Sequence, residues 1–273
     1  MDLSSFATAT PAPALQHLVR NYWRIDARHL NALSRDDLMP IEGGSGWMLV
    51  VDGQLEFATG TCGHGGVFDA STGSSNRLLG LDQADVIGIR FHPGAQARFT
   101  HIPATEYRNT HIPLSEAGVA TQRVLESLKR TNRWQERVSL LDRWLLSLVR
   151  APTESHIVMQ RLIKLILEQT MPLPASTLCE ASGWSERHLQ RNFHAGVGLS
   201  AQRLGKIARA NVALRTIKRS SQARINLSHV ALDHGYFDHA HMTRDFRQLF
   251  GIPPSSLIRP VKSLCSTRHR GVQ

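Results

Sequence analysis

Two sets of side chains in the C-terminal half are spaced as they would be on one exposed face of an α-helix. The sets lie 53 residues apart, position for position. The first is Arg187, Gln190, Arg191 and His194, and the second is Ala240, Thr243, Arg244 and Arg247, flanked by His239. In a major groove, arginine can pair with guanine and glutamine with adenine through two hydrogen bonds, while alanine can touch a thymine methyl and threonine can bond a base or a phosphate. These residue types predict two surfaces that read DNA, although arginine and glutamine are also common on helix faces that meet only water.

Both sets belong to a duplicated segment. The pattern His-apolar-x-Arg-x-Phe, followed after four residues by Gly-apolar, begins at His188 and again at His241. Each copy is preceded by a glycine and an aromatic residue, Gly183-Trp184 and Gly235-Tyr236, and these pairs are offset by 52 rather than 53. The second copy therefore has one extra residue in its turn. So many matching residue types indicate an internal repeat.

Each copy predicts a helix, a tight glycine turn and a second helix. In the first copy Gly183 suits the left-handed position that ends a helix, and Ser185 suits the N-cap of the next one. In the second copy a helix over 227–233 is followed by Asp238 as the expected N-cap. This order is that of a helix-turn-helix, although a plain helical hairpin has the same local signals. The two predicted units span residues 174–196 and 226–250.

A single helix is predicted over residues 200–219, between the two units. Its basic residues, Arg209 among them, lie mostly off its apolar stripe. About 20 residues at ~1.5 Å each span ~30 Å, close to the ~34 Å of one turn of DNA. Such a helix could set two recognition helices into successive major grooves, so that one chain reads two sub-sites.

The net charge of +10 is confined to one part of the chain. Residues 1–150 carry 15 Lys and Arg against 15 Asp and Glu, whereas residues 151–273 carry 17 against seven. This asymmetry indicates that the C-terminal part, unlike the N-terminal part, meets a polyanion such as nucleic acid. A basic domain without such a partner is the alternative.

The N-terminal part predicts a small antiparallel β-domain. Short apolar runs separated by glycine and polar residues fill the segment 47–91, and Asp52-Gly53 between the first two runs predicts a hairpin turn. Closely spaced strands without intervening helices favour a barrel or a sandwich. Residues 114–150 instead have apolar residues at helical spacing, which predicts helices that either pack on the β-domain or form a dimer face.

Several classes of protein lack support in the sequence. Three widely separated cysteines exclude a disulfide framework or a four-cysteine zinc site. No phosphate-binding loop, G-x-S-x-G or H-E-x-x-H motif occurs, so the sequence predicts no enzyme, catalytic residue, metal site or cofactor. No basic leader with an apolar run and no uninterrupted apolar stretch of about 18 residues is present, so we expect a cytoplasmic protein without a membrane partner.

Residues 160–258 resemble the DNA-binding domain of the AraC/XylS family. The stretch from Leu227 to Ser256, which contains Gly-Tyr-Phe-Asp, Thr-Arg-Asp-Phe and Phe-Gly-Ile-Pro-Pro, is similar to the family signature almost throughout. The segments 15–23 and 89–94, the latter reading Ile-Arg-Phe-His-Pro-Gly, are similar to the β-rich sensor domain of one branch of such regulators. The implied fold is α+β, with an N-terminal antiparallel sheet, flanking helices and an all-α C-terminal domain.

The resemblance implies a one-component transcription regulator. Its implied partners are double-stranded DNA, RNA polymerase, a small-molecule effector and a second copy of the chain, and activation is the commoner mode in the family. The implied domains are residues 1–150 for effector binding or dimerisation, 153–260 for DNA binding, and 261–273 as a basic tail. Arg187, Gln190, Arg191, His239, Thr243 and Arg244 take the family's base- or phosphate-contacting places.

Three features depart from the family pattern. Ala240 stands where a polar residue is common, Gly196 weakens the end of the first recognition helix, and the loop Ser220–Asn226 is somewhat long. Two alternatives to the regulator stay open. One is a DNA-binding protein without an effector, and the other is a catalytic domain fused to this module, for which the N-terminal part offers only Cys62 as a reactive thiol.

Overall fold

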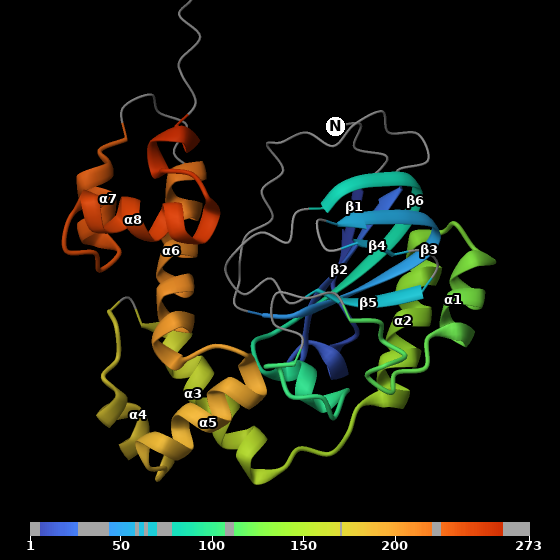
Figure 1. The fold of residues 1–273 in the computed structure, drawn as a ribbon, viewed down its shortest axis with the longest axis horizontal. Helices are drawn as coiled ribbons and strands as arrows, with labels where there is room; N and C mark the ends of the chain where they lie inside the picture. Colours follow the sequence, from blue (N-terminus) through green and yellow to red (C-terminus); the bar gives the residue numbers. More distant parts are fainter. Residues whose placement is uncertain are drawn as a thin grey trace, which may run out of the picture.

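The computed structural model describes residues 6–26, 44–57, 60–62, 65–69, 78–106, 112–169, 171–219 and 225–258. The predicted tail, residues 261–273, and most of the loop Ser220–Asn226 lie outside these ranges. Within them, an N-terminal sheet is joined to a C-terminal group of helices (Figure 1). None of the helices described is both long and apolar enough to cross a membrane.

The N-terminal strands form one antiparallel sheet. In the sheet the order is β1-β2-β6-β3-β4, and β5 pairs with β3 beside β4. Over the described strands the sheet does not close on itself, so of the two predicted architectures the sandwich fits and the closed barrel does not. The strands are β1 (Phe6–Ala9), β2 (Val19–Asp26), β3 (Gly46–Phe57), β4 (Gly60–Cys62), β5 (Gly65–Asp69) and β6 (Leu78–Phe91).

The predicted hairpin at Asp52-Gly53 is wrong. The chain does not reverse there, because β3 runs through both residues and stays paired with β6 on either side. The register shifts around Asp52, and Gly53 has a φ of 75°, a left-handed conformation that glycine adopts without strain. The dipeptide therefore forms a β-bulge that bends a long strand. An Asp-Gly sequence fits both a bulge and a hairpin turn, so the sequence alone does not distinguish them.

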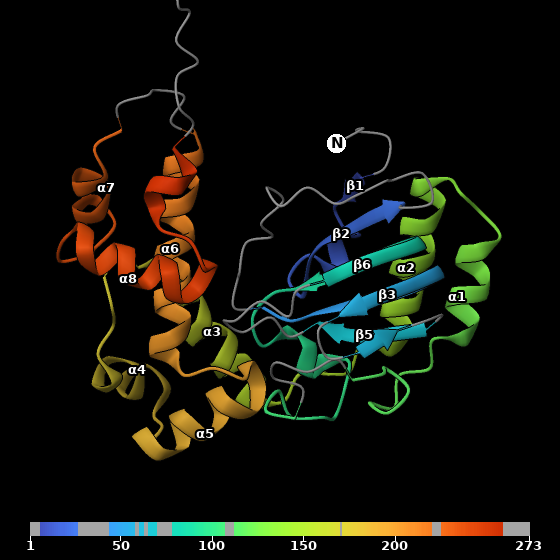
Figure 2. The same ribbon diagram turned by 45° about the horizontal axis from the view of Figure 1, so that its top comes forward.

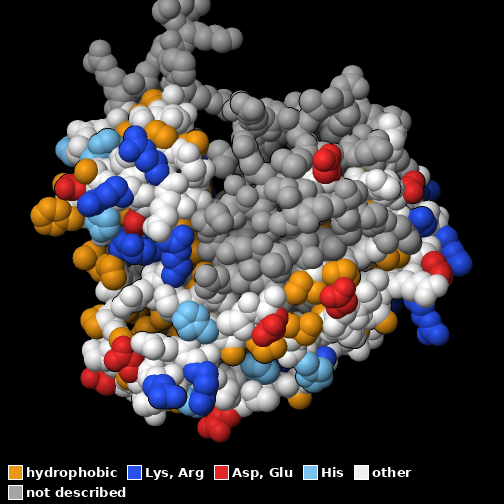
Figure 3. Space-filling model, in the orientation of Figure 1, with side chains coloured by type: hydrophobic (Ala, Val, Ile, Leu, Met, Phe, Trp, Pro, Cys, Tyr) orange, Lys and Arg blue, Asp and Glu red, His pale blue; other side chains and the backbone are white. Residues whose placement is uncertain are grey.

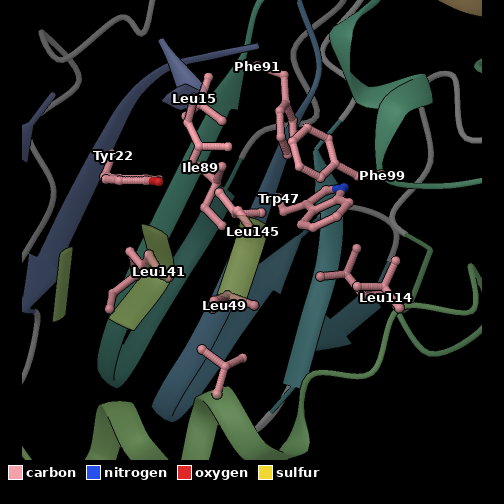
Figure 4. Close-up of a cluster of buried hydrophobic side chains, with 14 of the residues drawn as sticks. Leu15, Tyr22, Trp47, Leu49, Ile89, Phe91, Phe99, Leu114, Leu141 and Leu145 are labelled. Carbon is pink, nitrogen blue, oxygen red and sulfur yellow. The ribbon is translucent and has the colours of Figure 1, made fainter. Parts of the chain in front are cut away.

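Helices α1 (Gln122–Lys129) and α2 (Trp134–Leu148) cover one face of the sheet (Figure 2). The apolar residues of both helices are buried with the sheet residues in one cluster. Of the two roles predicted for residues 114–150, packing on the β-domain is therefore observed. Leu141 and Leu145 of α2 lie against this cluster, and Trp47 stands edge-on to Phe91 with ring centroids 5.0 Å apart (Figure 4). Burial of this kind is the main stabilising contribution to such a domain.

Gly88 of β6 has no room for a side chain, which leads to a first prediction. It lies opposite Trp23 of β2 in the register, and a Cβ added to it would lie 1.8 Å from Cε2 of the Trp23 indole. Since Trp23 is itself buried, we expect Gly88→Ala to lower the free energy of unfolding by about 1–3 kcal/mol. Urea denaturation of the full chain measures this change.

The matched control is Gly196→Ala, which should change stability in the opposite direction. A Cβ at Gly196 would meet nothing within 4 Å, and this glycine lies inside a helix, where alanine is favoured by about 1 kcal/mol. Equal stability of Gly88→Ala and the unmodified protein would show that Trp23 does not cover this strand as described.

The C-terminal helices share a second core, separate from that of the sheet. Helix α6 runs through this group, with α4 and α5 near its N-terminal end and α7 and α8 beside it further along (Figures 1 and 2). The helices are α3 (Glu154–Glu168), α4 (Ala175–Ser182), α5 (Glu186–Val197), α6 (Ala201–Arg219), α7 (Leu227–Asp233) and α8 (His239–Phe250).

Candidate nucleic-acid interface

The first helix-turn-helix unit is built by α4 and α5. Gly183 ends α4 with a φ of 70°, and the Ser185 hydroxyl accepts a hydrogen bond of 3.3 Å from the backbone N–H of His188. Leu189 and Phe193 lie on the inner face of α5 and are buried. The opposite face is exposed and carries all four residues of the first predicted set, Arg187, Gln190, Arg191 and His194.

The second unit repeats this construction with α7 and α8. Gly235 has a φ of 72°, and a carboxylate oxygen of Asp238 accepts a hydrogen bond of 2.6 Å from the N–H of His241. Met242 and Phe246 lie on the inner face of α8 and are buried. In the second predicted set Ala240, Arg244 and Arg247 are exposed, and His239 and Thr243 are half-buried.

Hydrogen bonds along the two helices orient part of each set. Arg191 donates to Nδ1 of His188 over 2.8 Å, and the Gln190 amide donates to Glu186 over 3.2 Å. In α8 the Thr243 hydroxyl lies 3.4 Å from Nε2 of His239. Within the described residues no ion pair involves Arg187, Arg244 or Arg247. Their guanidinium groups are thus available to an anionic or polar partner.

The seating of α8 on α6 depends on a buried charge that helical periodicity did not predict. Arg209 was expected off the apolar stripe of α6, but it is 5% exposed and lies 3.4 Å from Asp245 of α8. Lys206 also faces Asp245, at 3.5 Å. The sequence signal was an acidic residue on the inner side of α8, which needs a basic partner when it is buried.

Tyr236 completes this contact. Its ring lies under the Arg209 guanidinium, with the Arg209 Cζ 4.6 Å from the ring centroid. Burial raises the pKa of the Tyr236 hydroxyl to about 12, although Arg209 acts in the opposite direction. The hydroxyl therefore stays neutral at physiological pH, so Asp245 is the acidic group that faces Arg209.

Lys and Arg side chains gather over the recognition helices. Figure 3 shows two such groups on one side of the molecule, one over α8 and α6 and the other over α5. Positive charge beside an exposed recognition face supplies the sequence-independent part of binding to a phosphate backbone. The surface has the electrostatic character that DNA requires.

The two N-caps lead to a second prediction. We expect Ser185→Ala and Asp238→Ala each to lower the free energy of unfolding by about 1 kcal/mol, because each leaves a backbone N–H of the first helical turn without its acceptor. Thermal or urea unfolding of the three proteins measures the loss.

Thr121 provides the control for these caps. It occupies the N-cap position of α1, but its side chain makes no capping hydrogen bond. Thr121→Ala should leave stability almost unchanged. A loss for Thr121→Ala as large as that for Asp238→Ala would contradict the role of the capping bonds.

Comparison with known families supports this geometry. Residues 178–259, which begin inside α4 and contain the rest of both units, match a family model described as "Helix-turn-helix domain". The C-terminal domain is an AraC/XylS-type helix-turn-helix domain. The chain therefore carries the DNA-binding domain of a transcription regulator. Residues 7–113 match a second family model, described as "Domain of unknown function (DUF6597)".

Two solved structures show a distant similarity to this chain. A probable AraC family transcriptional regulator from Rhodopseudomonas palustris is 23% identical, covers 37% of this chain and 94% of its own, and has a TM-score of 0.35. ToxT from Vibrio cholerae is 10% identical, covers 93% of this chain and 98% of its own, and has a TM-score of 0.46. These likenesses are too distant to transfer a function. No curated protein matches the chain significantly.

Proposed function

We propose that this AraC-type regulator reads two successive major grooves of double-stranded DNA, with α5 in one and α8 in the next. The observation that carries the proposal is that both helices present an exposed basic and polar face and are joined by one helix, α6, which follows α5 directly and packs against α8. Residues 153–260 would form the reading domain and residues 1–150 the effector or dimerisation domain. The base- or phosphate-contacting residues would be Arg187, Gln190, Arg191, His194, His239, Ala240, Thr243, Arg244 and Arg247.

Helix α6 supports reading by one protomer, because it follows α5 directly and packs against both helices of the second unit. It contains 19 residues, and Lys206 and Arg209 in its first half face Asp245 of α8. A rigid connection of this kind suits two sub-sites on one face of the duplex, one turn of DNA, or ~34 Å, apart.

Selection of bound duplexes from a random pool by the full chain, at about physiological salt, tests the proposal. We expect a motif of two blocks spaced by about one helical turn. Inserting about five base pairs between the blocks turns one block to the opposite face, so affinity should fall to that of a single block. Enrichment of one block alone would show that only one unit reads bases, and salt-sensitive binding without enrichment would contradict specific reading.

Contacts between the two domains support control by an effector. The segment that follows β6 lies against the end of the first recognition helix, where the N–H of Ala104 donates to the carbonyl of Ala195 over 2.7 Å. Gly94 in the same segment lies against α3 and α5, since a Cβ there would lie 2.9 Å from Ile163 and 3.6 Å from Val197. A change in the sheet domain could therefore reach α5 directly.

A buried amide in the same segment suits a small polar ligand. Gln96 is 1% exposed, and within the described residues neither of its side-chain amide atoms has a hydrogen-bond partner. Buried polar groups are nearly always paired, by protein, water or ligand. An effector that bonds Gln96 should alter affinity for the selected duplex in the unmodified protein and not in Gln96→Leu.

Activation through RNA polymerase is the mode of regulation that we propose, following the family. Transcription in vitro from a promoter carrying the selected motif tests it, and activation should rise with occupancy of the motif. A homodimer is a further expectation that sedimentation of the full chain tests. Since one protomer presents both recognition helices, reading of two sub-sites does not require it.

A further inference from the structure

The two helix-turn-helix units differ by one inserted residue, and the structure identifies it. In the first unit the Trp184 ring stands edge-on to His188, with ring centroids 4.9 Å apart, and in the second Tyr236 stands edge-on to His241 at 5.3 Å. The N-cap follows the aromatic residue directly in the first unit, whereas Phe237 separates Tyr236 from the Asp238 cap in the second. Phe237 is therefore the extra residue that the offset of 52 against 53 requires.

Phe237 is also the most exposed large apolar side chain of the described residues. It is 86% exposed, while Tyr236 on one side is 3% exposed. Asp238 on the other side is fixed by its capping bond, and the N–H of Phe237 itself lies 3.4 Å from Nδ1 of His241. The backbone is thus held on both sides, and the phenyl ring projects into solvent from a fixed position at the start of α8.

An aromatic ring held in water is unfavourable unless a partner covers it. Burying apolar surface is the dominant favourable term of association, and a phenyl ring contributes a large area. Single exposed apolar residues need no explanation by themselves. Here the residue is an insertion between two anchored neighbours, directly before the helix that carries Ala240, Thr243 and Arg244.

We propose that Phe237 contacts the C5-methyl group of a thymine in the major groove, at the edge of the sub-site read by α8, and thereby specifies that base. The inference rests on the proposed reading of DNA by this helix. Phenylalanine contact with the thymine methyl is a known mode of direct readout. In helix-turn-helix proteins the N-terminal residues of the recognition helix are those that meet base edges.

The surroundings favour DNA over a protein as the partner of Phe237. Arg244 and Arg247 lie on the exposed side of the same helix, and Figure 3 shows basic side chains over α8. Among the described residues, Leu232 of α7 is the nearest other large apolar residue in sequence that is exposed, at 60% exposure, and it belongs to the other helix of the unit. Exposed basic side chains along the same helix suit a phosphate-lined groove better than an apolar protein surface.

Replacement of thymine by uracil tests the proposal, because uracil lacks only the C5-methyl group. The full chain is first used to select its duplex, and each thymine of the second block is then replaced in turn. With the unmodified protein we expect one replacement to weaken binding about fourfold, the factor for one buried methyl group. Phe237→Ser should weaken binding to the thymine duplex by about five- to tenfold and should be insensitive to that same replacement.

Two further variants separate the methyl contact from general effects. Phe237→Leu keeps an apolar side chain and should retain most of the affinity and the sensitivity to uracil. Leu232→Ser removes an exposed apolar side chain of the same unit and should leave the fourfold sensitivity to uracil intact. Circular dichroism and unfolding of each variant confirm that it is folded.

Each outcome decides between distinct conclusions. Failure of the unmodified chain to select any duplex would remove the proposed function itself. Selection of a duplex to which Phe237→Ser binds as tightly as the unmodified protein, with equal sensitivity to uracil at every position, would overturn the thymine contact and leave DNA reading intact. Unchanged DNA binding by Phe237→Ser together with reduced transcription by purified RNA polymerase would also overturn it, and would assign the ring to a protein contact.

Discussion

Arg244→Ala and Arg191→Ala should each weaken binding to the selected duplex by about 1–3 kcal/mol, or roughly 5- to 150-fold. Both side chains are exposed at the same repeat position of the two recognition helices. Arg191 must exchange its bond to His188 for a base, whereas no ion pair has to be broken for Arg244 within the described residues. Arg244→Lys should also lose specificity, because lysine cannot reproduce the two parallel hydrogen bonds of a guanidinium group.

Fluorescence anisotropy with the selected duplex and its single-base variants measures these losses. Each arginine variant should relax discrimination at one base pair and leave the others unchanged. Arg143→Ala serves as the control, because Arg143 is an exposed arginine on α2 in the sheet domain and should not affect affinity. A uniform loss across all sequences, with a smaller salt dependence, would show that the arginine contacts phosphate instead.

Asp85→Ala should lower the free energy of unfolding of the sheet domain by about 3–5 kcal/mol. Asp85 of β6 is 1% exposed, and its carboxylate lies 2.8 Å from Nη1 of Arg137 and 3.1 Å from Nε of Arg24. Arg137 is as deeply buried as Asp85. Removing the carboxylate leaves a buried guanidinium without this compensating charge, and α2 loses one of its contacts with the sheet.

Asp52→Ala is the matched control for Asp85→Ala. Asp52 faces Asp85 in the strand register, but its own pair with Lys129 is exposed and 4.0 Å long. Exposed pairs of this kind contribute little, so Asp52→Ala should change stability by less than about 1 kcal/mol. Urea unfolding followed by tryptophan fluorescence compares the two, and equal effects would contradict a structural role for the buried charge.

The C-terminal domain was largely predictable from sequence. The expected helix over 227–233 has those bounds in the structure, and Ser185 and Asp238 cap α5 and α8 as predicted. These features depend on interactions between residues a few positions apart, such as a side-chain oxygen and a backbone N–H three residues later. Local signals of this kind can be recognised in a single sequence, and the internal repeat supplied a second copy of each.

The sheet domain was less predictable. Asp52-Gly53 carries the sequence of a hairpin turn and lies within a continuous strand, because pairing with β6 on both sides is maintained across the bulge. The role of Gly88 could not be predicted either, because this glycine makes room for Trp23, which belongs to a strand distant in sequence. Strand pairing joins residues far apart in the chain. The same short sequence can therefore form a turn or part of a strand, depending on the strand that pairs with it.

A basic, duplicated helix-turn-helix domain with two matched sets of candidate DNA contacts can be recognised in the amino-acid sequence alone, because caps, glycine turns and helical periodicity are local. Which charges are buried depends on how the helices pack against one another. Helical spacing placed Arg209 outside the core, yet it lies between α6 and α8 against Asp245 and Tyr236. Likewise, the offset of the repeat predicted one extra residue in the second turn. The structure shows that this residue is Phe237 and that it projects outward between Tyr236, which is buried, and Asp238, which caps α8. Burial depends on what the other elements place beside a residue, and that information is not contained in the spacing of any one helix.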